Sequence, residues 1–221
     1  MKNKTVIVPI IIILGVLLID QILKIWVKTH LMIGEDIHIF GDRVMLKFVE
    51  NPGMAFGMEF GGNWGKLILS IFRILAVGGL IWYLVVLIKK KSNLFIISCI
   101  SLIIAGAAGN LIDCAFSGLM FDSGTTYDAE LGRWITYDGL SQWGGGYAGF
   151  LQGNVVDMFY CPVIRWGTPP DEFIFFRPIF NVADSAITIS VFLMIIFYKK
   201  LIPNKEETEN TATEQDYNTQ K

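Results

Sequence analysis

Aspartates stand in this sequence at the edges of long apolar runs, where charged residues are rare. Asp113 ends one such run, Asp184 lies near the start of another, and Asp157 stands in the apolar string NVVDMFY. A charged group at membrane depth is costly unless it is paired, so each of these is a candidate functional residue. Two carboxylates held close together can share one proton, so that one activates water while the other protonates a carbonyl oxygen. The chemistry that these residues allow is amide hydrolysis.

The sequence offers no other familiar hydrolytic centre. Its two histidines, His30 and His38, stand in no recognisable motif, so no serine or cysteine has a predicted base, and the pattern HExxH does not occur. The three cysteines lack the paired spacing of a zinc site or a disulfide framework. They are Cys99, Cys114 and Cys161. The carboxylates therefore remain the main candidates for chemistry.

The composition places these carboxylates in a membrane protein. The 221 residues are 53% hydrophobic and only 17% charged, with a mean hydropathy of +0.52. A soluble domain is about a quarter charged, so the deficit favours a chain that uses lipid as its solvent. The formal net charge of −2 provides no positive field for a nucleic-acid backbone. Partners are therefore expected in the membrane, and no nucleic acid is expected among them.

Four apolar runs are long enough to cross a bilayer, which takes roughly 20 helical residues. They cover residues 5–27, 66–88, 93–113 and 178–198. The first is not typical of a cleavable signal peptide, because it runs on to Trp26 and no small-x-small cleavage site follows. We therefore expect an all-α polytopic membrane protein with four transmembrane helices.

Basic residues beside the runs predict the orientation, because lysine and arginine collect on the cytoplasmic side. The lysines that flank the runs are Lys2, Lys4, Lys89, Lys90, Lys91, Lys199, Lys200 and Lys205. They place both termini in the cytoplasm, and the first loop and the segment 114–177 outside. Residues 1–202 are expected to form one membrane-embedded domain, and the polar tail 203–221 is expected to be disordered.

The outer segments have features of their own. The β-type runs IHIF and VMLKFV flank Gly41-Asp42 and predict a hairpin or small sheet, about residues 36–57, on the membrane surface. The segment 114–177 is rich in glycine, tryptophan and tyrosine and is long for a loop. Its aromatic residues suit either an interfacial anchor or a contact with substrate, and both interpretations stay open.

Polar residues of the runs converge on the outer membrane boundary in this orientation. Asp20 and Lys24 lie one helical turn apart and are expected to form an ion pair. Arg73 is the main exception to the convergence, and a structural partner or a snorkelling role is expected for it. The other polar residues at the boundary are Asn110, Asp113, Asp157, Asn181 and Asp184. Convergence from several segments indicates one shared site.

Five strings follow one another along the chain in the order of a known family. They are DQILK (20–24), NPGMAFG (51–57), GNLID (109–113), NVVD (154–157) and FNVADS (180–185). In this order and membrane context the sequence resembles lipoprotein signal peptidase, also called signal peptidase II. The resemblance implies a bacterial inner-membrane aspartic endopeptidase that removes signal peptides from prolipoproteins, cleaving on the amino side of the diacylglyceryl-modified cysteine. It also implies no metal or organic cofactor, contact with membrane lipids and inhibition by globomycin, and we expect a monomer.

The resemblance implies roles for individual residues. The catalytic dyad would be Asp157 and Asp184, which would hold a water that attacks the peptide directly, without an acyl-enzyme. The substrate-binding or supporting positions would be Asp20, Lys24, Asn51, Gly53, Asn110, Asp113, Asn181 and Ala183. The small outer sheet would cradle the substrate, and the site would lie near the outer face of the membrane.

The sequence departs from the family pattern at two places. Cys114 stands where many members have an arginine, and Arg133, Arg165 or Arg177 could substitute for it. In addition, residues 114–156, hereafter the insert, separate GNLID from the aspartate of NVVD, and most members have only a short turn between these two motifs. We expect the insert to form an enlarged outer loop, and one hypothesis is that it gates access to the site.

Three other functions compete with this interpretation. A small membrane transporter would need polar groups along a path through the membrane, and the runs have almost none on the cytoplasmic side. A metal-dependent membrane hydrolase could use Asp113, Asp157 and Asp184 as oxygen ligands, and EDTA would then abolish its activity. A non-enzymatic assembly protein would tolerate the loss of either carboxylate of the dyad.

Overall fold

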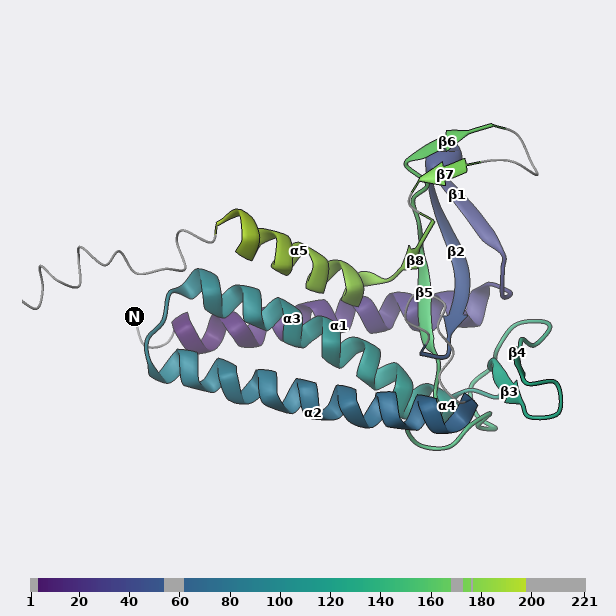
Figure 1. Ribbon diagram of the computed structural model, residues 1–221, viewed down its shortest axis with the longest axis horizontal. Helices are drawn as coiled ribbons and strands as arrows, with labels where there is room; N and C mark the ends of the chain where they lie inside the picture. The colour runs from purple at the N-terminus through teal and green to yellow at the C-terminus, as the bar shows by residue number, and fades with distance from the viewer. Residues whose placement is uncertain (1–3, 54–61, 168–172, 176, 198–221) are drawn as a thin grey trace, which may run out of the picture.

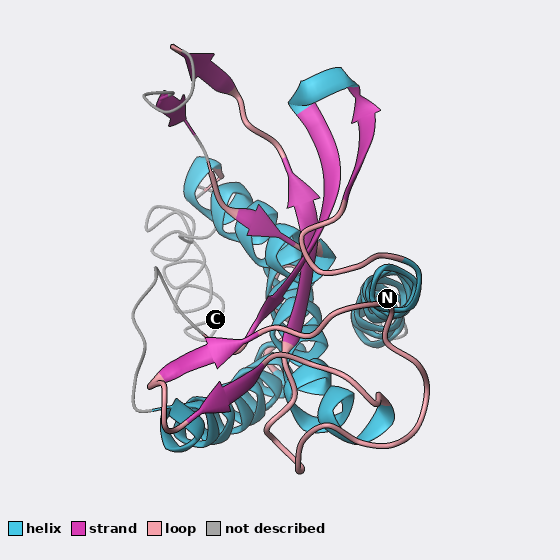
Figure 2. Ribbon diagram, turned by 90° about the vertical axis from the view of Figure 1, so that its right-hand side faces the viewer, coloured by secondary structure: helices cyan, strands magenta, loops and turns pink. Residues whose placement is uncertain are grey.

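The computed structural model describes residues 4–53, 62–167, 173–175 and 177–197. Its long helices are α1 (Lys4–His30), α2 (Gly62–Lys89), α3 (Leu94–Ile112) and α5 (Val182–Ile196). They lie side by side as a bundle, and a β-sheet crosses the end where α1 finishes and α5 begins (Figure 1). Figure 2 shows this end of the bundle, with the strands spread across it.

Three of the described helices are long and apolar enough to cross a membrane. They are α1, α2 and the continuous helical stretch from Leu94 to Met120. Ile11 and Leu14 on α1, and Phe72 on α2, are large apolar side chains that point outward, as lipid-facing residues do. Helix α5 is apolar but has only 15 described residues, and the predicted fourth run ends outside the described residues. The structure is therefore that of a helical membrane protein, and the fourth span stays a prediction.

Three predicted helix boundaries are wrong. The third run was expected to end at Asp113, but the helical stretch continues through the π-helical η2 (Asp113–Ser117) and α4 (Gly118–Met120). Backbone N–H groups of the insert bond the carbonyls of this extension, at 2.9 Å to Cys114 and 3.0 Å to Gly118. The fourth run starts as a strand, and α5 begins only after its N-cap, Asn181. Helix α2 begins at Gly62, four residues before the predicted start.

The small sheet that the sequence predicted is present. It contains β1 (Asp36–Phe40), β2 (Val44–Asn51), β5 (Val155–Tyr160) and β8 (Ile179–Phe180) in the order β1-β2-β5-β8. All neighbours are antiparallel, and the 3-10 turn η1 (Gly41–Arg43) joins the first two strands. The sheet thus joins the segment between α1 and α2 to β5, which begins at the last two residues of the insert, and to β8, which follows it. The end of the predicted hairpin (54–57) and the predicted tail (203–221) lie outside the described residues.

Two further strand pairs extend from this end of the molecule. The insert contains β3 (Thr126–Asp128) paired with β4 (Arg133–Ile135), and β6 (Ile164–Trp166) pairs with β7 (Phe173–Phe175). In Figure 1 the pair β3–β4 lies beyond α4, whereas β6–β7 lies on the far side of the sheet, beyond β8. The insert is therefore an ordered segment at the same end of the bundle as the sheet.

Two apolar clusters hold these parts together. One joins the end of α1 to the sheet and contains Val27, Leu31, Phe48, Val156 and Met158. The other joins α2 to α3 near the opposite end of the bundle and contains Leu84, Leu87, Ile97, Ile100 and Ile104. The first cluster fixes the sheet on the helices and so positions the residues of β2 and β5.

Helix α3 approaches α1 and α5 closely at two glycines. A Cβ atom at Gly109 would lie 2.7 Å from Asp20 Oδ2 and 3.2 Å from Ala183 Cβ, and one at Gly106 would collide with the carbonyl of Ala183. Since only glycine lacks a Cβ, the first residue of GNLID permits the contact of the three helices. This contact brings Asp20, Asn110 and Asp184 to the same end of the bundle.

Candidate active site

Asn181 links the two aspartates that the sequence singled out. Asp157 lies on β5, and Asp184 is the third residue of α5. The side-chain amide of Asn181 donates to Asp157 Oδ1 at 2.7 Å, and its backbone N–H lies 3.3 Å from Asp184 Oδ2. The backbone N–H of Asp184 donates in return to Asn181 Oδ1 at 2.9 Å, which completes a capping box at the start of α5. One N-cap residue therefore orients both carboxylates.

Asn110 continues this network toward α1. Its amide donates to Asp184 Oδ1 at 2.8 Å. Its carbonyl oxygen accepts from Asn181 at 3.0 Å and from Lys24 Nζ at 2.8 Å. Since the ammonium of Lys24 must donate, Asn110 must present its oxygen to it and its N–H to Asp184. The amide orientation of Asn110 is thus determined by its partners.

Asp157 is buried, and its surroundings favour the protonated form. Its residue is 5% exposed. Burial, and after it the negative charge of Asp184, raise the pKa of Asp157 to about 7, although Lys24 and the amides of Asn51 and Asn181 act in the opposite direction. Near neutral pH a substantial fraction of this carboxyl therefore carries a proton.

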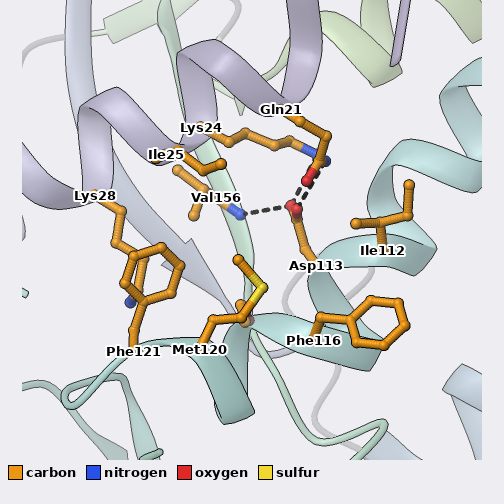
Figure 3. Close-up of a pocket in the computed structure, with 11 residues that line it drawn as sticks. Gln21, Lys24, Ile25, Lys28, Ile112, Asp113, Phe116, Met120, Phe121 and Val156 are labelled. Carbon is orange, nitrogen blue, oxygen red and sulfur yellow. Dashed lines mark hydrogen bonds and ion pairs between the residues drawn. The ribbon is translucent and has the colours of Figure 1, made fainter. Parts of the chain in front are cut away.

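Lys24 is the charged centre of the supporting residues. Its ammonium lies 2.9 Å from Asp20 Oδ2, as expected from their spacing, and 2.8 Å from Asp113 Oδ2. Asp20 Oδ1 accepts the backbone N–H of Ala183 at 2.9 Å, and Asp113 Oδ2 lies 3.3 Å from the N–H of Val156 (Figure 3). These contacts tie α1 and α3 to α5 and β5, the two elements that bear the dyad candidates.

Asn51 approaches the site from β2. Its amide lies 3.4 Å from Asp157 Oδ2, and its side-chain oxygen accepts the backbone N–H of Gly53 at 2.9 Å. Gly53 has φ +105°, a conformation that residues with a side chain rarely adopt. The structure thus brings all ten predicted site residues into one network of hydrogen bonds and ion pairs at one end of the bundle.

Cys114 has a partner that the sequence did not suggest for it. Arg73 of α2 donates a hydrogen bond to Cys114 Sγ at 2.8 Å. Arg133, one of the arginines considered for this place, is exposed on the insert. The expected structural partner of Arg73 is therefore found, and all three cysteines are free thiols.

Several residues in the site or next to it were missed in the sequence. Gln21 donates to Asp113 Oδ1 at 3.0 Å. Lys28, one turn beyond Lys24, is 1% exposed and pairs with Glu50, the residue before Asn51. The repeated spacing 20, 24 and 28 on α1, and an acid in the otherwise apolar strand β2, are signals that could have indicated these residues. Within the described ranges there is no group of three or more His, Cys, Asp or Glu side chains that could hold a metal ion.

The fold and the site together define a helical membrane protein with two carboxyl groups that contact the same asparagine where the bundle meets its sheet. The chain belongs to the signal peptidase II family, whose model, described as signal peptidase (SPase) II, matches residues 12–200. It is therefore a membrane peptidase by family.

Individual relatives agree with this assignment. The chain is 42% identical over 196 residues to a lipoprotein signal peptidase of Porphyromonas gingivalis, which covers 84% of this chain and 80% of that protein. A lipoprotein signal peptidase of Amoebophilus asiaticus is 33% identical over 211 residues, 89% of this chain and 81% of that protein. A solved structure of a bacterial membrane enzyme is similar with a TM-score of 0.55 and 28% identity, covering 89% of this chain and 90% of the other.

Proposed function

We propose that this protein is an aspartic endopeptidase that removes signal peptides from bacterial prolipoproteins, cutting on the amino side of the diacylglyceryl-modified cysteine. Membership in the signal peptidase II family supports the substrate class. The observation that carries the aspartic mechanism is the pair of contacts from Asn181 to Asp157 and Asp184. These contacts hold a buried carboxyl group, that of Asp157, and a half-buried one, that of Asp184, against the same asparagine.

The proposed reaction is a direct attack by water. Asp184 takes a proton from a water molecule, whose oxygen bonds to the scissile carbonyl carbon, while Asp157 gives its proton to the carbonyl oxygen. The tetrahedral diol then breaks its C–N bond as one of its hydroxyl groups returns a proton to Asp157 and the leaving nitrogen takes the proton held by Asp184. The products are a signal peptide with a free carboxyl group and a lipid-bearing cysteine with a free amino group. The pKa of Asp157, about 7, supports its role as the proton donor.

The position of the site suits a substrate that is partly embedded in lipid. The elements that bear the network, α1, α3, α5 and β5, meet at the end of the bundle that the sheet crosses (Figure 1). A signal helix could lie among the spans while the acyl chains of the modified cysteine stay in the bilayer. We place the protein in the bacterial cytoplasmic membrane as a monomer with four spans, both termini in the cytoplasm and the site near the outer face. Globomycin is the inhibitor expected to occupy this site.

The rival metal-dependent hydrolase fits the contacts of Asp113 poorly. One of its oxygens accepts from Gln21, and the other pairs with Lys24 and faces the N–H of Val156. An oxygen ligand of a divalent cation should instead have lone pairs directed at the ion. Activity that is unaffected by EDTA would agree with the dyad, and activity that EDTA removes would favour a metal.

The decisive experiment compares purified wild type with Asp157→Asn and Asp184→Asn on a lipid-modified prolipoprotein. Each variant keeps the shape of the side chain and removes one proton-transfer group, so cleavage should fall below detection. Asp42→Asn, which removes an exposed carboxylate of the turn η1, is the matched control and should cleave as wild type does. Substantial cleavage by either dyad variant would rule out the proposed mechanism.

A further inference from the structure

A second buried polar network belongs to the insert and is centred on Asn154. This residue stands directly before β5 and is 1% exposed. Its side-chain amide donates to Glu50 Oε2 at 2.8 Å and to the carbonyl of Thr125 at 2.9 Å. Its side-chain oxygen accepts from Lys66 Nζ of α2 at 2.5 Å. The Asn154 side chain therefore joins the insert to α2 and to β2.

The backbone of Asn154 is also fully bonded. Its N–H donates to the hydroxyl oxygen of Tyr147 at 2.8 Å, and its carbonyl accepts from Ser117 Oγ at 3.1 Å. Both partners lie in the insert, and their hydroxyl groups are 3.1 Å apart. With both donors and the acceptor of its side chain used as well, Asn154 has little freedom to move. The start of β5 is thus fixed by the insert.

Glu50 and Lys28 form the other half of the network. Glu50 Oε1 pairs with Lys28, and Glu50 Oε2 accepts the backbone N–H of Thr125 at 2.6 Å. Lys28 Nζ also donates to the carbonyl of Ser123 at 2.9 Å. Three aromatic rings of the insert face this ammonium at 5.0–5.3 Å, those of Phe121, Tyr137 and Tyr147 (Figure 3 shows Phe121). The insert therefore encloses a charge pair formed by α1 and β2.

The sheet register relates this network to the dyad. In the antiparallel pair of β2 and β5, Glu50 lies opposite Val156, and Asn51 lies opposite Val155. Successive side chains of a strand point to opposite faces. Glu50 therefore points to the face of the insert, whereas Asn51 and Asp157 point to the face where Asn181 lies. Glu50 is adjacent to Asn51 on β2, and Asn154, directly before β5, is three residues from Asp157.

We propose that Asn154 and Glu50 are positioning residues, through which the insert fixes the places of Asp157 and Asn51 in the site. The inference rests on the proposed function. Asp157 follows Asn154 by three residues, about 10 Å at about 3.3 Å per residue of strand. Between them, the N–H of Val156 faces Asp113, and its carbonyl faces Asn181. A shift at Asn154 therefore moves the start of a strand whose third residue carries a reacting group. A gate would instead change only the entry of substrate.

The test measures kcat and KM separately for Asn154→Ala and Glu50→Gln in the full chain, with a lipid-modified prolipoprotein as substrate. A displaced dyad should lower kcat by about tenfold to a hundredfold, with KM within twofold of wild type. Glu130→Gln removes an exposed carboxylate of the same insert and should leave both constants unchanged. A raised KM with unchanged kcat would show that the insert controls access, and it would overturn the inference.

A swap of the two side chains separates positioning from a general loss of stability. In the double variant Glu50→Gln with Asn154→Asp, the amide and the carboxylate exchange places, and one N–H···O contact between them can form again. It also removes the repulsion between two carboxylates that Asn154→Asp alone creates, so it should recover part of the kcat that this single variant loses. The inference fails if the double variant melts within a few degrees of wild type but has a kcat no higher than that of Asn154→Asp. This criterion uses a folded protein, and where Asn154→Asp itself does not fold, the kcat of the double variant is compared with that of wild type. Asp157→Asn in the same assay tests the proposed function separately. Cleavage by this variant would refute the dyad, whereas normal kcat values for the Asn154 and Glu50 variants would refute only the positioning role.

Discussion

Asn181 Nδ2 lies 2.7 Å from Asp157 Oδ1, and this contact joins the N-cap of α5 to β5 of the sheet. The same residue caps the helix by accepting the N–H of Asp184 at 2.9 Å. Helix capping and the orientation of the dyad are therefore one structural feature. The FNVADS string encodes both features. Its asparagine, Asn181, stands at the N-cap of α5, and its aspartate, Asp184, stands at the N3 position of the same capping box.

Asn181→Ala should lose more activity than the loss of a helix cap explains. Removal of an N-cap costs about 1 kcal/mol of stability, but this variant also removes the donor to Asp157, and a small displacement of a reacting group lowers kcat by about a hundredfold. Asn93→Ala is the matched control, because Asn93 caps α3 through the N–H of Phe95 and is remote from the dyad. Similar melting temperatures with a large difference in kcat would support the dual role. Equal kcat values would contradict it.

The rate of cleavage should fall as the pH rises through about 7. In the proposed reaction Asp157 donates a proton, and burial together with the charge of Asp184 raises its pKa to about 7. Lys24, Asn51 and Asn181 also face this carboxyl and favour its ionised form. Below pH 7 the proton is in place, and above it kcat/KM should fall by up to about tenfold per pH unit. A profile of kcat/KM from pH 5 to 9 that stays flat up to pH 9 would refute this role.

Asp157→Asn should abolish activity and yet stabilise the protein at alkaline pH. The folded pKa of Asp157, about 7, lies above its ordinary value of 3.8, so the folded state binds more protons between these values and stability declines as pH rises. The neutral amide removes this decline. The gain at pH 8 is on the order of 4 kcal/mol at most, from about three pKa units, and it should disappear near pH 4.

Thermal unfolding in detergent at pH 8 and at pH 5 measures this gain. Asp157→Asn should melt several degrees above wild type at pH 8, and by a smaller margin at pH 5. Asp42→Asn removes an exposed carboxylate and should melt with wild type at both values. A lower melting temperature for Asp157→Asn at pH 8 would show that the ionised carboxyl stabilises the fold.

Part of the candidate site could be predicted from spacing alone, because several of its residues recur at helical intervals. The roles of Asn51 and Asp157, which lie on strands, were implied only by the resemblance. Asp20 and Lys24 share one helix face, and the pair forms at 2.9 Å. Asn181 and Asp184 fit the spacing of a capping box, which is a local property. The helix ends were harder to predict, since the extension beyond Asp113 depends on backbone donors from the far end of the insert.

The contacts of the insert could not be predicted from sequence, because they also join residues that are far apart along the chain. Glu50 and Asn154 are 104 residues apart, and Lys28 and Glu50 are 22 apart. No periodicity links the members of either pair. Glu50 meets Asn154 only after β2 and β5 have paired, and it meets Lys28 only after β2 has packed against the end of α1. Buried polar residues of this kind are recognised from the fold, where each one must find a partner.

Lys24→Met should be among the most destabilising substitutions at this end of the bundle. It leaves Asp20 and Asp113, both buried, without their shared cation, and breaking a buried ion pair on one side costs about 3–5 kcal/mol. Adding Asp113→Asn removes one of the two uncompensated charges, so the double variant should melt above the single one. Lys89→Met, at an exposed position on α2, should change stability by no more than about 0.5 kcal/mol. If Lys24→Met melts with wild type, Lys24 does not hold the three helices together, and the support of Asp184 through Asn110 must come from another contact.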